Sequence, residues 1–317
     1  MKIVVLDGYT LNPGDLDWSA LENIGDVKIY ERTPADEVLD RAEGAEIVFT
    51  NKTVLSADIQ GKLPSLKYIG VLATGYDVVD IEAARRHKIT VTNVPGYGPD
   101  SVAQMVFAHI LNITNNVAGH AQDVNQGGWS KTEDFCYWLT PQMELKDKIL
   151  GIVGYGEIGR ATARIGIAFG MEVLIYTRTV PASLPDRVRH TNLEELLASA
   201  DIISLHCPLT DQTRELIDEK KIKLMKDSAI LVNCSRGPLV HEKALADALN
   251  AGKIKAACLD VLSEEPVKSE NPLIGARNCY ITPHIAWATR EARTRLLSIA
   301  IDNLRAFLRQ ERQNCIT

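Results

Sequence analysis

Three side chains with complementary chemistry follow apolar runs in the second half of the chain: Arg236, Glu265 and His284. Ligands of open α/β sheets bind beyond the carboxyl ends of the strands, so we expect these side chains at one sheet edge. An arginine binds a carboxylate bidentately, and a carboxylate beside an imidazole favours the protonated ring, which is a proton donor. Beside a hydride-carrying cofactor, the set predicts a dehydrogenase for a carboxylate-bearing substrate. Taken singly, the three are typical of a surface arginine, a turn carboxylate and a satisfied core histidine.

A glycine-rich segment predicts where that cofactor binds. The pattern G-x-G-x-x-G falls at Gly154, Gly156 and Gly159. It follows the apolar run 149–153 and opens a helical stretch that ends near Gly170. In chain order, the glycines allow a tight turn, a close approach to a pyrophosphate, and close packing of helix and strand. The helix N-terminus adds N–H groups for the anion. The context predicts a dinucleotide site, with a helix that merely follows a glycine-rich turn as the alternative.

The end of the next apolar run bears on the choice of cofactor. An NAD site normally has Asp or Glu there, bonded to the ribose hydroxyls. This chain has Thr177 at that position, followed by Arg178. A missing carboxylate removes repulsion of a 2′-phosphate, and an arginine can pair with that phosphate. The sequence therefore favours NADP(H), or dual use. The alternative is NAD(H) bound through the Thr177 hydroxyl, with Arg178 in solvent.

Two series of short apolar runs supply the strands that would position these residues. The runs alternate with helical patterns, which is typical of βαβ units and a parallel sheet. We therefore predict an α/β protein with two doubly wound, Rossmann-like domains. The expected strands are 3–6, 27–30, 47–50, 68–72 and 90–93 in the first series, and 149–153, 173–176, 202–205, 230–233, 256–261 and 280–282 in the second.

One long helix and one aromatic loop lie between the two series. The apolar spacing predicts a helix from about Asp100 to Gln126. Ser101 and Gln104 match a capping box at its start. The loop 127–143 that follows carries four aromatic residues. It is interpreted either as a surface loop that covers a core edge, or as a lid or subunit contact.

The domain boundaries are expected at the two ends of the second series. A cluster of Pro and Gly at 95–99 interrupts the chain. A final amphipathic helix, 289–309, is expected to return to the first domain. The predicted domains are a substrate-binding, catalytic domain at 1–99 plus 288–317, and a dinucleotide-binding domain at 100–287.

Composition excludes several classes of protein. The 317 residues are 45% hydrophobic, which suffices for two cores. A formal net charge of −6 argues against a general nucleic-acid binder. No apolar run approaches the roughly 18 residues of a membrane span, and no signal-peptide pattern opens the chain. We therefore predict a cytoplasmic protein with neither a membrane nor a nucleic-acid partner. The six scattered cysteines predict reduced, mostly buried thiols and no metal site.

Three motifs resemble signatures of the D-isomer-specific 2-hydroxyacid dehydrogenase family. They are Asn233–Gly237, Leu259–Pro266 and Thr282–Ala286. The spacing between Arg236 and Glu265 is also similar to that of the family. The resemblance extends over essentially the whole chain. It implies two doubly wound domains, of which the first is flavodoxin-like and discontinuous, and a homodimeric assembly.

The resemblance also implies a role for each matching residue. Arg236 would bind the substrate's carboxylate and carbonyl, His284 would protonate the carbonyl oxygen, and Glu265 would keep His284 protonated. Further substrate contacts are implied for Ala73, Thr74, Gly75 and Trp138. Cofactor contacts are implied for Gly154, Tyr155, Gly156, Glu157, Ile158, Gly159, Thr177, Arg178, His206, Cys207, Pro208, Thr213, Asn233, Cys234, Ser235 and Asp260.

The resemblance extends to a branch of the family. Segments 73–77, 134–138 and 284–289 resemble bacterial glycerate dehydrogenases, also called hydroxypyruvate reductases. Segment 176–179 resembles NADP-using glyoxylate/hydroxypyruvate reductases. The expected activity is NAD(P)H-dependent interconversion of hydroxypyruvate or glyoxylate with D-glycerate or glycolate. A D-lactate-type dehydrogenase and a cofactor-sensing interaction protein on the same fold are the alternatives.

Overall fold

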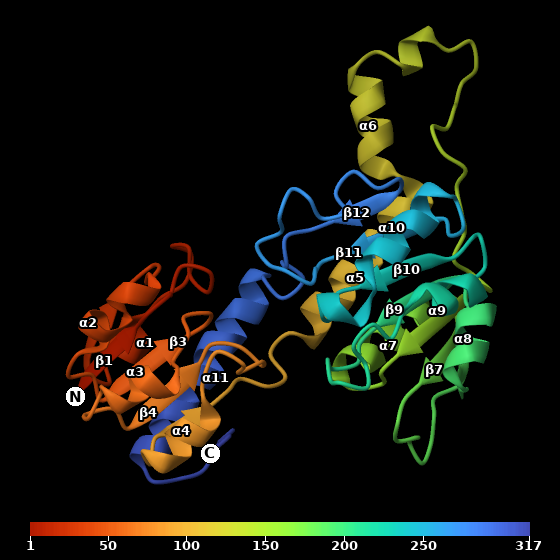
Figure 1. Ribbon diagram of the computed structural model, residues 1–317. Coiled ribbons are helices and arrows are strands. Elements are labelled where there is room, and N and C mark those ends of the chain that lie inside the picture. Colours follow the sequence, from red (N-terminus) through yellow and green to blue (C-terminus); the bar gives the residue numbers. More distant parts are fainter. The chain divides into compact units, whose positions relative to one another are not determined.

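The computed structural model describes all residues from Met1 to Thr317, as two compact units (Figure 1). Unit 1 comprises Met1–Gly98 and Trp287–Thr317, and unit 2 comprises Pro99–Ala286. Both junctions lie one residue before the expected ones. Each unit has a parallel sheet with helices on both faces, so the predicted fold class is confirmed.

The sheet of unit 1 has five parallel strands: β1 (Lys2–Val5), β2 (Asp26–Ile29), β3 (Ile47–Thr50), β4 (Tyr68–Val71) and β5 (Thr90–Thr92). Their order across the sheet, β2-β1-β3-β4-β5, is that of flavodoxin-like folds. The register places Ile3 between Val27 and Ile47. All residues of β3 and β4 are buried. Such strands are covered on both faces, which explains why they occur in the sequence as continuous apolar runs.

Helices from distant parts of the chain cover this sheet. On one face lie α1 (Ser19–Glu22) and the C-terminal helix α11 (Arg290–Leu308), which packs against β4 and β5 (Figure 1). On the other face lie α2 (Val38–Ala42), which follows the 3₁₀ turn η1 (Ala35–Glu37), then α3 (Ala57–Gly61) and α4 (Ile81–Arg86). Arg293 of α11 donates two hydrogen bonds of 2.7 Å to the Asp15 carboxylate. The C-terminal helix therefore completes unit 1, as predicted.

The sheet of unit 2 has seven parallel strands: β6 (Ile149–Val153), β7 (Glu172–Tyr176), β8 (Val188–His190), β9 (Ile202–Leu205), β10 (Ile230–Asn233), β11 (Ala256–Leu259) and β12 (Cys279–Ile281). Their order is β12-β11-β10-β9-β6-β7-β8. The strand order reverses between β6 and β9, where ligands of doubly wound folds bind. Strand β8 was not predicted. It is an edge strand in which only Val188 is buried, so it has no apolar run to identify it.

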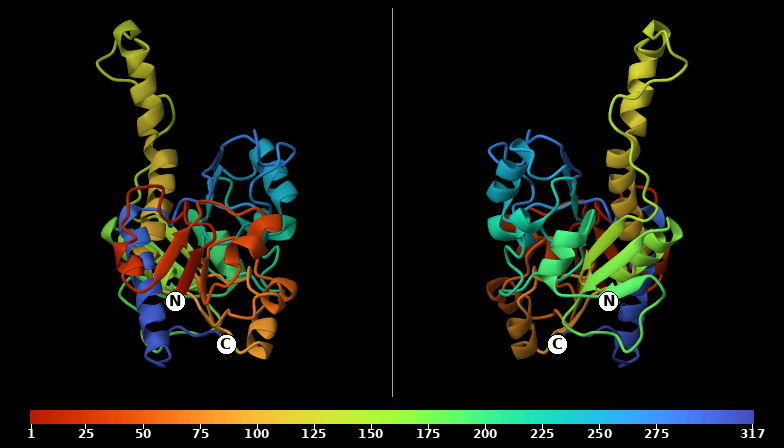
Figure 2. Two further views of the ribbon diagram at one scale, coloured as in Figure 1. Left: turned by 90° about the vertical axis from the view of Figure 1, so that its left-hand side faces the viewer. Right: turned by 90° about the vertical axis from the view of Figure 1, so that its right-hand side faces the viewer.

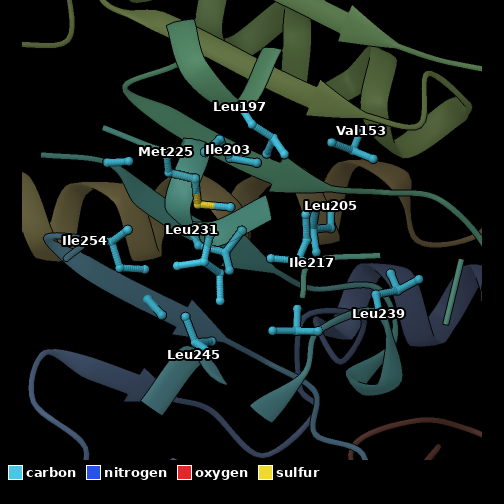
Figure 3. Packing of buried hydrophobic residues seen from close by; sticks show 14 of the residues in the cluster. Val153, Leu197, Ile203, Leu205, Ile217, Met225, Leu231, Leu239, Leu245 and Ile254 are labelled. Atoms are coloured by element: carbon cyan, nitrogen blue, oxygen red, sulfur yellow. The ribbon is translucent and has the colours of Figure 1, made fainter. Parts of the chain in front are cut away.

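Two layers of helices cover the sheet of unit 2. Helices α5 (Pro99–Asn115) and α7 (Glu157–Ala168) lie on one face. Helices α8 (Leu193–Ser199), α9 (Glu219–Leu224) and α10 (Glu242–Asn250) lie on the other. Figure 3 shows the core between the sheet and helices α8, α9 and α10. There, Leu231 and Ile203 of the sheet pack near Met225 and Leu197. Burial of these apolar side chains fixes the carboxyl ends of β6, β9, β10 and β11 at one edge.

The predicted long helix is two helices, α5 and α6 (Val117–Asn125). Asn116 between them has a φ of 47°, in the left-handed region that ends a helix. The predicted capping box is also wrong, because the helix already begins at Pro99 and Ser101 lies within it. The Ser101 hydroxyl donates instead to the carbonyl of Ala286. Helix α6 and the loop after it, which contains the 3₁₀ turn η2 (Trp129–Lys131), form an arm that extends away from the sheet of unit 2 (Figure 2).

The cysteines and the helix lengths bear on two further expectations. All six cysteines are free, but only Cys234 and Cys258 are fully buried and Cys136 is exposed. Cys207, Cys279 and Cys315 are half-buried, so the expectation of mostly buried thiols holds in part and fails at Cys136. None of the helices combines the length and the apolar content that crossing a bilayer requires.

Candidate active site

The structure brings two of the three predicted catalytic side chains into contact. The Nδ1 atom of His284 lies 2.6 Å from Oε2 of Glu265, and both side chains are about two-thirds buried. The other Glu265 oxygen accepts a hydrogen bond of 3.1 Å from the backbone N–H of Leu262. The Glu265 carboxylate is thus held from two sides, by the His284 ring and by the backbone of Leu262.

The backbone of His284 adopts an unusual conformation. Its φ is 53°, in the left-handed region that residues with a side chain rarely occupy. Hydrogen bonds to Asp260 hold the residues around it. The His284 N–H donates to the Asp260 carbonyl at 2.8 Å. The Asp260 carboxylate accepts from the N–H groups of Ile285 and Ala286, at 2.9 and 2.8 Å, and from the Thr282 hydroxyl at 2.6 Å.

This use of Asp260 was not predicted. The resemblance implied a cofactor contact, whereas the buried carboxylate binds the segment that carries His284. A local sequence pattern cannot identify partners more than twenty residues away.

Arg236 is exposed and follows β10 at the start of the 3₁₀ turn η3 (Gly237–Leu239). The Asn233 side chain donates to the Arg236 carbonyl at 2.8 Å, and the guanidinium donates to the Ser235 carbonyl at 2.8 Å. A Cβ atom on Gly237 would lie 1.9 Å from the carbonyl carbon of Leu262. Only glycine fits at this position, so the Arg236 turn packs directly on the segment that leads to Glu265.

The glycine-rich turn between β6 and α7 fits a dinucleotide. Gly154 has a φ of 99°, and a Cβ on it would lie 2.6 Å from the Cys207 nitrogen. A Cβ on Gly159 would lie 2.2 Å from the Gly154 carbonyl oxygen, which explains the close packing of helix and strand. At Gly156, which caps α7, a Cβ would meet no atom within 4 Å. The backbone there faces open space at a helix N-terminus, as a pyrophosphate requires.

Side chains at the ends of β9 and β10 tie the neighbouring loops together. The Ser235 hydroxyl donates to the Cys207 carbonyl at 2.9 Å, and the Thr213 hydroxyl donates to the Pro208 carbonyl at 2.7 Å. Burial of the His206 ring lowers its pKa to about 3. Its Nε2 bonds to the Ser204 hydroxyl, while Nδ1 has no partner. The structure therefore shows these polar side chains ordering the loops.

Cys234 differs from the other residues predicted to contact the cofactor at these strand ends. Its side chain is buried in the core beside α5, where burial raises its pKa. Only the Cys234 backbone is therefore available to a ligand.

Thr177 and Arg178 line an open pocket of about 550 Å³ at the carboxyl ends of β7 and β8. His190 and Asn192 line the same pocket. So does Glu195 of α8, an exposed carboxylate that accepts a hydrogen bond from the Thr191 hydroxyl. Sequence reasoning missed Glu195, because it lies on a different element from the strand end where a carboxylate is expected.

In unit 1, the predicted substrate loop follows β4. The Ala73 carbonyl accepts from the Val94 N–H at 2.9 Å, and the Thr74 carbonyl accepts from the Asn93 side chain at 2.7 Å. The Thr74 hydroxyl donates to the Val94 carbonyl at 2.8 Å. These bonds fix the carbonyls of the loop and leave the N–H groups of Thr74 and Gly75 available to a ligand.

Trp138 lies on the arm of unit 2. Its neighbours are tied to α6: Tyr137 donates to Asp123 at 2.6 Å, and the Leu139 N–H donates to His120 at 3.0 Å. Phe135 and Trp138 are 89% and 67% exposed. The first interpretation of the aromatic loop, a cover for a core edge, is therefore wrong. No group of three His, Cys, Asp or Glu side chains is arranged to hold a metal ion.

Comparison with known proteins identifies the family. The sequence profile of the D-isomer specific 2-hydroxyacid dehydrogenase NAD binding domain matches residues 107–286. The chain belongs to the D-isomer-specific 2-hydroxyacid dehydrogenase family. It is 48% identical to a hydroxypyruvate reductase of Blautia hydrogenotrophica, over 100% of this chain and 99% of that protein. It is 40% identical to a glycerate dehydrogenase of Methylorubrum extorquens, over 99% and 98% of the two chains.

A solved structure is similar along its whole length. It is an acyclic imino acid reductase (Bsp5) in complex with NADPH and D-Arg, with a TM-score of 0.86, 30% sequence identity and 100% coverage of both chains. The comparisons confirm three predictions: the family, an oxidoreductase that interconverts 2-oxo and 2-hydroxy acids, and a nicotinamide cofactor.

Proposed function

We propose that this D-2-hydroxyacid dehydrogenase reduces hydroxypyruvate or glyoxylate, reversibly, to D-glycerate or glycolate, with NADP(H) favoured over NAD(H). The observation that carries the proposal is the 2.6 Å contact between His284 and Glu265. The Arg236 turn packs against the segment that leads to Glu265, through Gly237 and Leu262. The relatives named hydroxypyruvate reductase and glycerate dehydrogenase support the choice of substrate.

In the proposed reaction, the Arg236 guanidinium binds the substrate carboxylate through two charge-assisted hydrogen bonds. Because Nδ1 of His284 bonds to Glu265, the proton that reaches the substrate is the one on Nε2. His284 donates this proton to the carbonyl oxygen, and Glu265 stabilises the protonated ring beforehand. When bound, the reduced nicotinamide supplies the hydride for the carbonyl carbon. One proton and one hydride convert the carbonyl group to the alcohol.

Two further groups of residues have proposed roles in binding. In unit 1, the N–H groups of Thr74 and Gly75 would bind a carboxylate group, since the carbonyls of their loop are already engaged. In unit 2, the N–H groups at the start of α7 would bind the cofactor's pyrophosphate. Unit 2 also carries Arg236, Glu265 and His284, so the proposed catalytic groups belong to the dinucleotide-binding unit.

Initial rates test the proposal directly. Hydroxypyruvate, glyoxylate and pyruvate are each reduced with NADH and with NADPH, and the six values of kcat/KM are compared. We expect hydroxypyruvate or glyoxylate to give the highest values. A clear lead for pyruvate would favour a D-lactate-type enzyme. Cofactor binding without turnover of any 2-oxo acid would favour the cofactor-sensing alternative.

Cofactor preference depends on the pocket beside β7. Arg178→Ala is expected to raise the Kd for NADPH about 10–100-fold, since a hydrogen bond to a charged group contributes about 1.5–3 kcal/mol. The Kd for NADH is expected to change little, because that cofactor has no 2′-phosphate. Fluorescence titration with both cofactors measures the two constants.

Glu195 provides the control for this prediction. Glu195→Gln keeps a hydrogen-bond acceptor for Thr191 but removes a negative charge from the pocket, and it should lower the Kd for NADPH more than that for NADH. Equal effects of Arg178→Ala on both cofactors would contradict the 2′-phosphate assignment.

A homodimer is proposed from the arm, whose exposed aromatics are typical of subunit interfaces. Trp138 would reach the neighbouring subunit's substrate. Trp138→Ala is expected to lower kcat/KM for hydroxypyruvate about tenfold, as loss of an apolar contact does, with the dimer retained in sedimentation. Trp129→Ala, on the same arm, is the control.

A cytoplasmic location also remains a prediction.

Mixed dimers distinguish whether Trp138 acts on its own or the neighbouring subunit. Trp138→Ala and His284→Ala subunits are mixed and allowed to exchange. If Trp138 acts across the interface, each mixed dimer contains one intact site and activity rises above that of either variant. No gain would contradict the assignment.

A further inference from the structure

A chain of hydrogen bonds connects α5 to the segment that carries His284. His109, on α5, is buried, and its Nε2 lies 3.2 Å from the Thr282 hydroxyl. That hydroxyl donates to Asp260 at 2.6 Å. The Asp260 carboxylate in turn accepts from the N–H groups of Ile285 and Ala286. No function described above uses His109 or Thr282.

The direction of each bond follows from the number of protons. A threonine hydroxyl has one proton, and Thr282 gives it to the Asp260 carboxylate, which has none to offer. The bond to His109 must therefore be donated by its Nε2–H. Burial lowers the pKa of His109, against the opposing effect of the Asp260 charge, which favours a neutral ring with its proton on Nε2. The bonds therefore run in one direction, from His109 through Thr282 to Asp260.

This chain ends at the residues on both sides of His284. The left-handed backbone of His284 is unfavourable for a residue with a side chain, so it persists only if its neighbours are held. Asp260 bonds to residues 282, 284, 285 and 286, and Ser101 bonds to the Ala286 carbonyl. Fixing Asp260 therefore fixes the direction in which the His284 ring leaves the backbone.

We propose that His109 and Thr282 are positioning residues, which orient Asp260 so that it presents His284 to Glu265 and the substrate. This inference rests on the proposed role of His284 as proton donor. The charged or titratable groups in the arrangement are Asp260, Glu265, His109 and His284. Two buried thiols adjoin them: Cys234 faces Asp260, and Cys258 donates to the His109 carbonyl at 3.8 Å. His109 and Thr282 act only through Asp260 and are assigned no contact with the substrate.

The test compares isosteric and conservative variants in the full-length protein. Thr282→Val has the shape of threonine without the hydroxyl, whereas Thr282→Ser keeps the hydroxyl. We expect Thr282→Val to lower kcat by about 10–100-fold, since small misplacements of a reacting group have effects of this size. The Kd for NADPH should stay within about twofold. Thr282→Ser should recover most of the kcat.

The division of the effect between kcat and KM separates positioning from general structural damage. If the His284 ring is turned away from the substrate carbonyl, proton transfer slows and kcat falls, while KM for hydroxypyruvate, which depends on Arg236, changes little. A purely structural role would lower the melting temperature and would not affect kcat selectively. An unchanged kcat in folded Thr282→Val would overturn the proposal.

His109 gives a second, independent pair of variants. His109→Gln keeps an N–H donor close to the position of Nε2, and His109→Leu removes it. We expect His109→Leu to show the same loss of kcat at a nearly unchanged KM as Thr282→Val, and His109→Gln to recover most of the kcat. The double variant should be no worse than either single one, because both break the same chain. Additive losses would contradict the proposal that His109 acts through Thr282. If Thr282→Val does not fold, the comparison of His109→Leu with His109→Gln tests the proposal instead.

Failure of this inference can be distinguished from failure of the proposed function. If His284→Ala keeps full activity, the proton-donor role of His284 is wrong, and the positioning role of His109 and Thr282 is wrong with it. If His284→Ala is inactive but Thr282→Val is normal, the proton-donor role of His284 is supported and the positioning role of His109 and Thr282 is wrong.

Discussion

Replacing His284 with alanine is expected to lower kcat by about 10²–10⁴-fold, the contribution of a positioned general acid. His284 carries the proton that the substrate oxygen must receive, and its Nδ1 is already bonded to Glu265 at 2.6 Å. Cofactor binding should be retained, because the glycine-rich turn and the pocket beside β7 are formed by other residues. Stopped-flow reduction of hydroxypyruvate measures kcat, and fluorescence titration with NADPH measures the retained binding.

Glu265→Gln is the matched control for this experiment. Glutamine keeps an acceptor for Nδ1 of His284 but removes the negative charge beside the ring. The ring should therefore stay in place, and kcat should fall, but by less than in His284→Ala. A normal kcat in Glu265→Gln would contradict the assigned role of the Glu265 charge. Wild-type activity in His284→Ala would contradict the assignment of His284 as the general acid.

Arg236→Gln is expected to lower kcat/KM by about 10²–10³-fold, since two charge-assisted hydrogen bonds to the carboxylate are lost. The Arg236 turn itself should remain intact. It is held by the Asn233 side chain and by the contact of Gly237 with Leu262, neither of which involves the guanidinium. Most of the loss should appear as a higher KM, measured from initial rates at saturating NADPH.

Two comparisons make the Arg236 prediction specific. Arg277→Gln changes the net charge equally at an exposed position of the same unit, and it should leave KM unchanged. Arg236→Lys keeps the charge but cannot bind a carboxylate bidentately, so it should recover only part of the activity. A normal KM in Arg236→Gln would exclude this residue from substrate binding.

Most of the fold could be predicted from the sequence, because its strands are buried on both faces and therefore occur as continuous apolar runs. Strand β8 is the exception, since an edge strand with one buried residue has no such run. The two predicted catalytic groups that touch, Glu265 and His284, could also be found, because each lies a few residues after such a run. Local signals failed where a single residue redirects the chain, as Asn116 does by ending α5.

The sequence by itself determined the elements of this protein, the glycine-rich turn and the types of group that perform the chemistry. These depend on side-chain periodicity and on the backbone freedom of glycine, which are properties of neighbouring residues. Only the tertiary structure decided which partners those groups have. It placed Asp260 on the segment around His284, joined His109 to Thr282, and put Glu195 in the pocket of Arg178. These partners come from different elements, and only the packing of helices on the sheet brings them within hydrogen-bond or Coulomb range.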